Sequence, residues 1–480
     1  MTNQTINKIF SGVFWSSLEM IVNTIFSLLI QLLLAKLLMP DDFGVLALAM
    51  VFTLIVEVTS DLGMGAVLIQ KKIENLKPNH FHTANITGFV WAIFLYALMS
   101  FIVAPFAANF MDQEILKTII PVLSLSIIFN SISLIPRTKL IKEMRFKFVA
   151  LTNNLSNFLS GTIAILLAYN DFGVWSLVSF TILKPFFCIP FYFYYSKWRP
   201  KLIWKKSCFE YIFSFGLITS ATSVTNVLTG KFDYFIIGKL LNTSSLGYYS
   251  FAILITNLFR DRLVAVLNKV LYPYYTTLQD NRDRMLSSFL KTTAINITFI
   301  YPIILGVILF SEYFLQYFFL DKWNESIILI KIFSCTVLIQ MLNNSHTTLI
   351  RAAGEVKVEF YLQLVKSLIF FIPLITIGTH YFGLIGAATS HLIATLLGLL
   401  VSFYVMKIIF NFRLKLLIDS VGNKVFWYLI IFIITLLIKY YCMWQIAFVS
   451  YLSLIVSYFL VKEKQLINML RKFTTNNKPK

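Results

Sequence analysis

The residues of this chain best able to do chemistry are charged side chains inside long apolar segments. They comprise four bases and three acids: Lys231, Arg260, Arg262, Lys366, Glu57, Asp61 and Asp233. A charge at the centre of a bilayer costs roughly 2.5–3.5 kcal/mol on insertion scales. Side chains of this kind therefore face a protein interior or a water-filled cavity.

The four bases predict a cationic cavity that binds an anionic group. A guanidinium presents a planar fork of donors that matches a phosphate, which favours a phosphorylated ligand. The alternative is structural: Lys231 with Asp233, and Arg260 with Glu57, would form internal ion pairs that hold helices together.

The three carboxylates are candidates for coupling or gating, because buried carboxylates bind protons and cations in pumps. Glu57 and Asp61 are four residues apart and share a helix face. H⁺ and Na⁺ are the only cofactors that these side chains suggest, and no metal-ligand or catalytic spacing accompanies them. Asp61 lies in DLGMG, where a helix cap or a packed turn is the alternative.

Composition places these charges in a membrane protein. The 480 residues are 58% hydrophobic and 13% charged, whereas a soluble domain has roughly 25% charged residues. The net charge of +19 does not indicate nucleic acid, because the bases lie in short loops rather than in a basic stripe with aromatics. We therefore expect an all-α, multi-pass membrane protein whose surface partner is the lipid bilayer.

About 14 segments are long enough to span a bilayer, which takes about 20 apolar residues. They cover residues 13–38, 43–68, 84–109, 115–136, 148–169, 173–195, 211–241, 245–270, 294–318, 326–349, 358–379, 383–408, 425–441 and 443–461. With the N-terminus in the cytoplasm, the inner side carries 29 Lys and Arg and the outer loops carry six. This asymmetry predicts that both termini are cytoplasmic.

An internal repeat organises the segments. AKLLMPDDFG at residues 35–44 recurs as GKLLNTSSLG at 238–247, and Phe172-Gly173 recurs as Phe382-Gly383. Repeats of about 200 residues are typical of duplicated helix bundles in transporters. We expect two parallel six-helix lobes, at residues 1–205 and 206–415, followed by two extra helices and a basic tail at 416–480.

Several stretches resemble a known family. They are FGVLALAMVFTLIVEVTSDLGMGAVLIQKK (43–72), IPRTKLIKEMRFKFVAL (135–151), FDYFIIGKLLNTSSLGYYSFA (232–252) and KVLYPYYTTLQDNRDRM (269–285). Together they resemble the Wzx-type polysaccharide flippases (O-antigen and colanic-acid-like) of the multidrug/oligosaccharidyl-lipid/polysaccharide exporter superfamily. Asp233 and Asp61 match the acidic positions of that family's D-x-x-x-IG and DLG motifs.

The resemblance implies two six-helix lobes around a central cavity in the bacterial cytoplasmic (inner) membrane. The implied substrate is an undecaprenyl-diphosphate-linked oligosaccharide of cell-surface polysaccharide biosynthesis, as for lipopolysaccharide O-antigen, capsule or exopolysaccharide. The implied partners are the polysaccharide polymerase and chain-length machinery. In related lipid II flippases the two extra helices form a groove for the polyprenyl tail.

Two other functions are alternatives to the flippase. A multidrug-type, cation-coupled antiporter on the same fold should have a site dominated by carboxylates and aromatics. In this chain the bases among the embedded candidates outnumber the acids, four to three. A membrane polymerase or ligase should carry a large outer loop with catalytic residues, and the largest outer loop, around 312–325, is too small. We therefore expect a transporter and not an enzyme.

Overall fold

A computed structural model describes residues 3–60, 62–70, 76–210 and 230–462. These residues form helices, turns and connecting segments, with no strand among them. The result confirms the all-α fold. Within lipid every backbone polar group must find a partner inside the protein, and a helix supplies those partners along a single segment.

The chain divides into two compact units, Met1–Phe251 with Thr379–Ala387, and Ala252–Gly378 with Ala388–Lys480. The predicted lobe boundaries at 205/206 and 415/416 remain predictions. In the described residues nine helical stretches are long and apolar enough to cross a membrane. The predicted number of fourteen spans stays a prediction, because the segment at 211–241 lies mostly outside the described residues.

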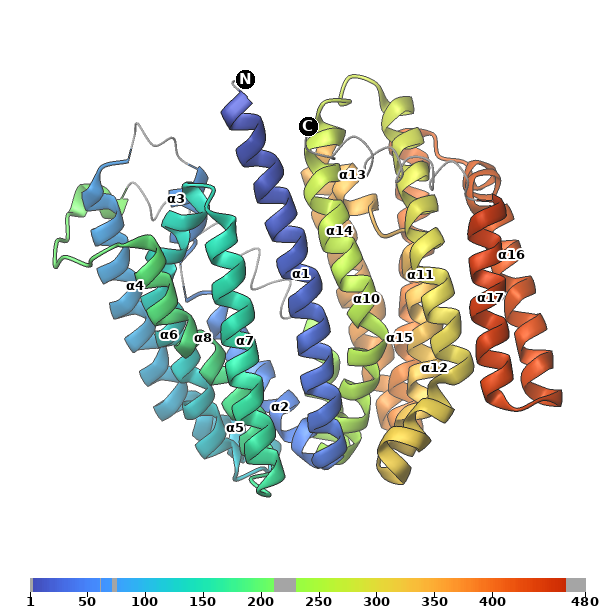
Figure 1. Cartoon of the computed structure of the whole chain (residues 1–480), viewed down its shortest axis with the longest axis horizontal. Helices are drawn as coiled ribbons and strands as arrows, with labels where there is room; N and C mark the ends of the chain where they lie inside the picture. Colours follow the sequence, from blue (N-terminus) through green and yellow to red (C-terminus); the bar gives the residue numbers. More distant parts are fainter. Residues whose placement is uncertain (1–2, 61, 71–75, 211–229, 463–480) are drawn as a thin grey trace, which may run out of the picture. The chain divides into compact units, whose positions relative to one another are not determined.

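The first unit is built on long helices that run side by side (Figure 1). In it α6 packs against α4 and α8, and α7 packs against α1 and α8. Its helices are α1 (Asn3–Leu37), α2 (Pro40–Glu57), α3 (Met64–Gln70), α4 (Pro78–Leu98), η2 (Met99–Val103), α5 (Ala104–Met111), α6 (Leu116–Lys142), α7 (Phe146–Tyr169), α8 (Val174–Ser196) and the start of α10 (Thr243–Thr276).

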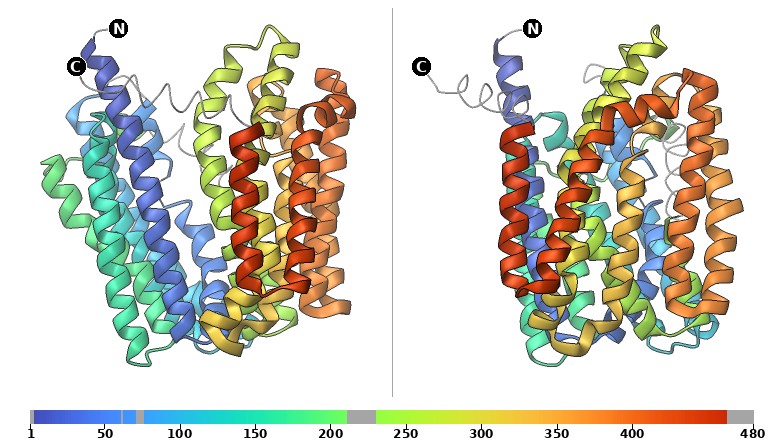
Figure 2. Two further views of the ribbon diagram at one scale, coloured as in Figure 1. Left: turned by 45° about the vertical axis from the view of Figure 1, so that its right-hand side comes forward. Right: turned by 90° about the vertical axis from the view of Figure 1, so that its right-hand side faces the viewer.

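Except for Thr379–Ala387 of α15, which belong to the first unit, the second unit holds most of α10 and the helices that follow it. They are α11 (Arg282–Phe319), η3 (Leu320–Trp323), α12 (Asn324–Met341), α13 (His346–Ala352), α14 (Val356–Leu364), η4 (Val365–Phe371), α15 (Ile372–Phe410), α16 (Leu414–Tyr441) and α17 (Trp444–Lys462). The two predicted C-terminal helices are α16 and α17, which form a hairpin packed on α11 (Figure 2). The Tyr428 hydroxyl secures the hairpin by donating to the Thr298 carbonyl at 3.0 Å.

Two predicted spans are broken in the structure. The segment 43–68 divides into α2 and α3, with Leu62 and Gly63 at positive φ between them. At the break the Thr59 carbonyl accepts from the Leu62 backbone N–H at 3.2 Å and from the Trp91 indole N–H at 3.0 Å, so this backbone group keeps partners inside the protein. The segment 326–349 likewise divides into α12 and α13.

Both repeated stretches of the sequence contain a glycine that the backbone requires. The first pair of glycines is Gly173 and Gly383, which have positive φ. Gly173 has φ +51° and ψ −131°, and its counterpart Gly383 has φ +60° and ψ −143°. This conformation is almost closed to residues with a Cβ. The equivalent turns therefore share one geometry as well as one dipeptide.

The other pair, Gly44 and Gly247, meets where the first turns of α2 and α10 cross. A Cβ on Gly44 would lie 1.7 Å from the Thr243 carbonyl oxygen, and a Cβ on Gly247 would lie 1.8 Å from the Pro40 carbonyl oxygen. The contact is reciprocal: each glycine faces the first residue of the opposite helix. We call this the glycine crossing.

Candidate functional site

Lys366 is the embedded cation with the clearest chemistry. It lies in η4, a π-helical stretch between α14 and α15, and its Nζ is 2.9 Å from His346 Nε2. The Nδ1–H of His346 donates to the Asn343 carbonyl, so Nε2 carries the lone pair that accepts from the ammonium. Among the described residues Lys366 has no carboxylate within ion-pair distance, so its positive charge meets a neutral partner.

The surroundings of Lys366 hold its side chain in place. Its aliphatic stem packs on Gly398, where an added Cβ would lie 3.5 Å from Cγ. The Ser402 hydroxyl lies 3.4 Å from the same His346 nitrogen and donates to the Gly398 carbonyl at 2.7 Å. A π-helical stretch inside an α-helix is often found at a functional site, because it re-aims one side chain.

Arg260 is the second described base of the set, and it also lies in the second unit. Its guanidinium donates to Asp261 Oδ1 from Nε at 2.9 Å and from NH2 at 2.6 Å, while NH1 donates to the side-chain amide oxygen Oε1 of Gln340. The Arg260 side chain is 22% exposed, whereas that of Asp261 is 59% exposed. The Asp261 carboxylate is therefore more exposed to solvent than the Arg260 guanidinium that it contacts. The Gln340 side-chain amide binds the guanidinium at NH1.

A histidine lies within reach of the Arg260 charge. The ring of His391 packs edge-on against Phe333 and Phe371, and the charge of Arg260 acts on it. His346, beside Lys366, is buried, whereas His391 is only half-buried. The side chain of Arg262 lies outside the described residues.

Lys231 and Asp233, in the first unit, form a compact local cluster. The Lys231 ammonium lies 3.9 Å from the centre of the Tyr234 ring. Asp233 is 2% exposed, accepts from the Tyr249 hydroxyl at 2.9 Å and accepts from the Tyr234 backbone N–H at 3.0 Å. The pairing of Lys231 with Asp233 that the sequence suggests as a structural alternative stays a prediction.

Glu57 accepts from the Asn130 side-chain amide at 2.9 Å. Asp61 lies outside the described residues, so its predicted place on the helix face of Glu57 stays a prediction. The expected pairing of Glu57 with Arg260 also stays a prediction. The partners that the structure gives them are Asn130 for Glu57, and Asp261 and Gln340 for Arg260.

Sequence reasoning missed an amide network in the first unit. The Asn153 side chain donates to Glu19 and accepts from the Tyr192 hydroxyl at 2.7 Å. Glu19 is a charged residue in an apolar segment, and this position could have identified it as a residue that needs a polar partner. Asn153 and Tyr192 carry no charge, so the sequence does not single them out. An asparagine in a helix also gives no sign of which residue it bonds.

Comparisons with known proteins agree with this fold. The family described as polysaccharide biosynthesis protein matches residues 33–328. The chain is 22% identical over 403 residues to the lipopolysaccharide biosynthesis protein WzxC of Escherichia coli strain K12, covering 83% of this chain and 81% of that one.

Two solved structures share the architecture. The lipid II flippase MurJ in its inward closed conformation has a TM-score of 0.72 at 17% identity, covering 95% of this chain and all of that one. An inward-facing multidrug resistance MATE family transporter has a TM-score of 0.64 at 14% identity, covering 82% of this chain and 98% of that one. The match over residues 33–328 spans more than half of the sequence, and the chain is a member of the polysaccharide biosynthesis protein family.

Proposed function

We propose that this chain translocates undecaprenyl-diphosphate-linked oligosaccharide repeat units across the bacterial inner membrane, for the assembly of a cell-surface polysaccharide. Family membership supports a role in polysaccharide biosynthesis, and the fold likeness to a lipid II flippase suits a lipid-linked substrate. Both termini would lie in the cytoplasm, as the charge asymmetry of the loops predicts. The polymerase and chain-length machinery would receive the product on the outer side.

The observation that carries the proposal is Lys366. A diphosphate needs cations, and a cation inside a membrane span is costly unless something compensates it. Lys366 faces a neutral histidine and meets no carboxylate among the described residues. It is therefore available to an incoming anion, whereas an antiporter for cationic drugs would need the opposite charge at this point.

Arg260 would serve as the second anchor for the diphosphate. Its NH1 is held by a neutral amide, and its carboxylate neighbour is more than half exposed. A substrate phosphate could displace Asp261 and take over the guanidinium fork, because bidentate phosphate contacts are charge-assisted and strong. The remaining predicted residues stay candidates: Lys231 and Arg262 for binding the substrate, and the carboxylates Glu57, Asp61 and Asp233 for coupling transport to H⁺ or Na⁺.

Transport in proteoliposomes tests the proposal. A fluorescent undecaprenyl-diphosphate-linked oligosaccharide is placed in the membrane, and a quencher reports the fraction that has crossed. The Lys366→Gln variant should insert and purify normally yet lose most of the transport rate. The matched control is Lys331→Gln: Lys331 also lies in a helix of the second unit, but it is already paired with Glu312 at 3.1 Å.

The outcome separates the two functions. Loss of transport in Lys366→Gln with activity kept in Lys331→Gln supports the flippase. If the wild-type protein fails to move the lipid but accumulates a cationic dye against an ion gradient, the antiporter explains the fold instead.

A further inference from the structure

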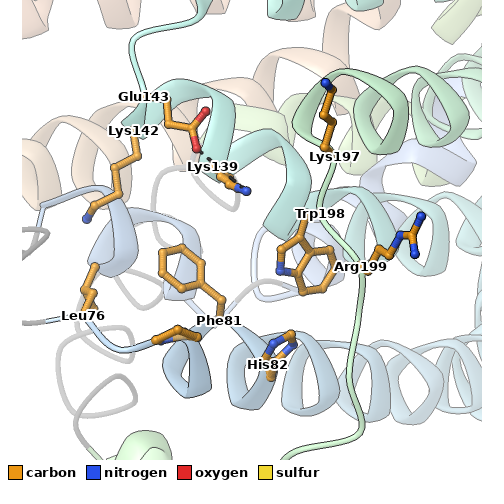
Figure 3. A pocket seen from close by; sticks show the side chains of 10 residues that line it. Leu76, Phe81, His82, Lys139, Lys142, Glu143, Lys197, Trp198 and Arg199 are labelled. Atoms are coloured by element: carbon orange, nitrogen blue, oxygen red, sulfur yellow. Dashed lines mark ion pairs between the residues drawn. The ribbon is translucent and has the colours of Figure 1, made fainter.

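A pocket in the first unit is lined by none of the embedded charges described above. It is a cavity of about 360 Å³, lined by side chains of α4, α6 and the segment after α8. Figure 3 shows the rings of Phe81 and Trp198 in this pocket, with the tip of Lys139 pointing into the space between them.

The pocket lies at one common end of three candidate membrane spans. Those spans are Pro78–Met111, Leu116–Lys142 and Val174–Ser196. The lining residues come from the start of the first span, the end of the second and the residues just after the third. Such ends lie where the hydrocarbon meets water, which is the level of lipid headgroups.

Its charge is strongly positive. Four bases, Lys139, Lys142, Lys197 and Arg199, line it against a single carboxylate, Glu143. The Lys139 ammonium is 3.9 Å from that carboxylate, a loose ion pair at the outer edge of bonding distance. Lys197 and Arg199 are exposed, and neither forms an ion pair within the described part of the chain.

An aromatic wall gives the pocket an apolar side that is already organised. The His82 ring stacks on Trp198 with centroids 5.7 Å apart and an interplanar angle of 24°. His82 Nδ1 also accepts from the Lys201 backbone N–H at 3.2 Å, which fixes the ring. Trp198 itself belongs to a buried apolar cluster with Leu68 and Ile135, so its indole cannot swing away.

We propose that this pocket binds the phosphate headgroup of a membrane lipid, whose apolar chain continues along the helices below. Clustered bases would hold the phosphate, and Phe81 with Trp198 would cover the first apolar atoms of the lipid. Two sources supply this chemistry: an anionic phospholipid of the bilayer, or a polyprenyl diphosphate. The pocket lining does not include Lys366, so binding at the pocket can be tested independently of the proposed transport.

Native mass spectrometry of the full chain in detergent tests this inference. The variant is Lys197→Asn with Arg199→Gln, which removes two pocket charges that no described ion pair uses. Asparagine suits position 197 because Lys197 has φ +51°. The matched control is Lys205→Gln with Lys206→Gln, an equal loss of charge in the same basic segment but outside the pocket lining.

Four probes are titrated: phosphatidylglycerol, undecaprenyl diphosphate, phosphatidylcholine and diacylglycerol. We expect the wild type to bind at least one of the first two, and the pocket variant to bind it about tenfold more weakly or worse, while the control keeps wild-type affinity. The probe with the larger loss is the occupant, and diacylglycerol should show no difference between variants. Should the double variant disturb folding, Arg199→Gln alone is measured, with an expected loss of about fivefold.

Equal binding of both anionic lipids by the wild type and the pocket variant would overturn the inference. So would an equal loss in the control, since that would mean general charge attraction instead of a pocket. Equal binding of diacylglycerol and phosphatidylglycerol by the wild type would exclude the phosphate as the recognised group. None of these results depends on whether the chain transports its proposed substrate.

Discussion

The glycine crossing between α2 and α10 makes a quantitative prediction. In the Gly44→Ala variant the new Cβ would lie 1.7 Å from the Thr243 carbonyl oxygen, against about 3.4 Å for ordinary contact. The two backbones would have to move apart by about 1.7 Å, because the clashing atom belongs to the main chain and cannot rotate away. Overpacking of this kind costs typically about 1–3 kcal/mol, and the better helix propensity of alanine returns about 1 kcal/mol at most.

The separation would also strain the polar contacts beside the crossing. Asp41 accepts from the hydroxyls of Thr243 and Ser244, the latter at 3.2 Å, so a shift of this size breaks both. Each such hydrogen bond contributes about 0.5–1.5 kcal/mol. We therefore expect a net loss of about 2–4 kcal/mol in the free energy of unfolding, measured for the purified protein in mixed detergent micelles.

Reciprocity makes the test sharper. Gly247→Ala alone should cost about as much as Gly44→Ala, because its Cβ would lie 1.8 Å from the Pro40 carbonyl. The double variant should cost much less than the sum, since one movement apart relieves both clashes. Gly88→Ala is the control: its Cβ would meet the Ser131 hydroxyl at 3.4 Å, an ordinary contact. Additive losses, or a loss in Gly88→Ala as large as in Gly44→Ala, would refute the shared crossing.

Three further predictions concern the embedded charges and the topology. Tyr249→Phe removes a hydroxyl donor from buried Asp233 and should lower the free energy of unfolding by about 1–3 kcal/mol, and an unchanged stability would mean that the bond contributes nothing. Arg260→Ala should insert normally yet lose transport, with Arg260→Lys recovering only part of the rate because a point charge lacks the planar fork; full rate in the lysine variant would exclude bidentate binding. Reporter fusions after Lys147 should be cytoplasmic and those at Asp171 periplasmic, and the reverse pattern would overturn the predicted orientation.

Composition and patterning predicted the fold well, because lipid imposes so few solutions. Low charge and long apolar runs allow only helices, whereas their grouping into two six-helix lobes stays a prediction. The break after Met341 has no signal in the sequence, and the break after Glu57 was expected only as the alternative of a cap or turn at DLGMG. In a soluble helix a glycine pair such as that in DLGMG would suggest an end, but membrane helices keep glycine and proline without breaking, so the pattern is ambiguous.

The site was predicted only at the level of residue type. Charge in an apolar run identifies Lys366 and Asp233 as unusual, yet it does not say what they touch. Their partners, His346 and Tyr249, are polar residues from other helices or other turns. Such contacts depend on helix rotation and crossing, and a single sequence records neither.

The repeat shows which constraints survive duplication. Identity between the halves persists at Gly44 and Gly247, where two backbones touch, and at Gly173 and Gly383, where φ is positive. At these positions any side chain would clash with the backbone or force a strained φ, and this holds for any transported substrate. The charged positions behave in the opposite way: Asp233 aligns with Ile30 when the halves are shifted by 203 residues. Backbone geometry keeps the same glycine at equivalent positions of the two halves. The charged side chains are not constrained in this way and can differ between the halves. We therefore propose that substrate specificity is to be sought at the embedded cations of the second half, Lys366 and Arg260.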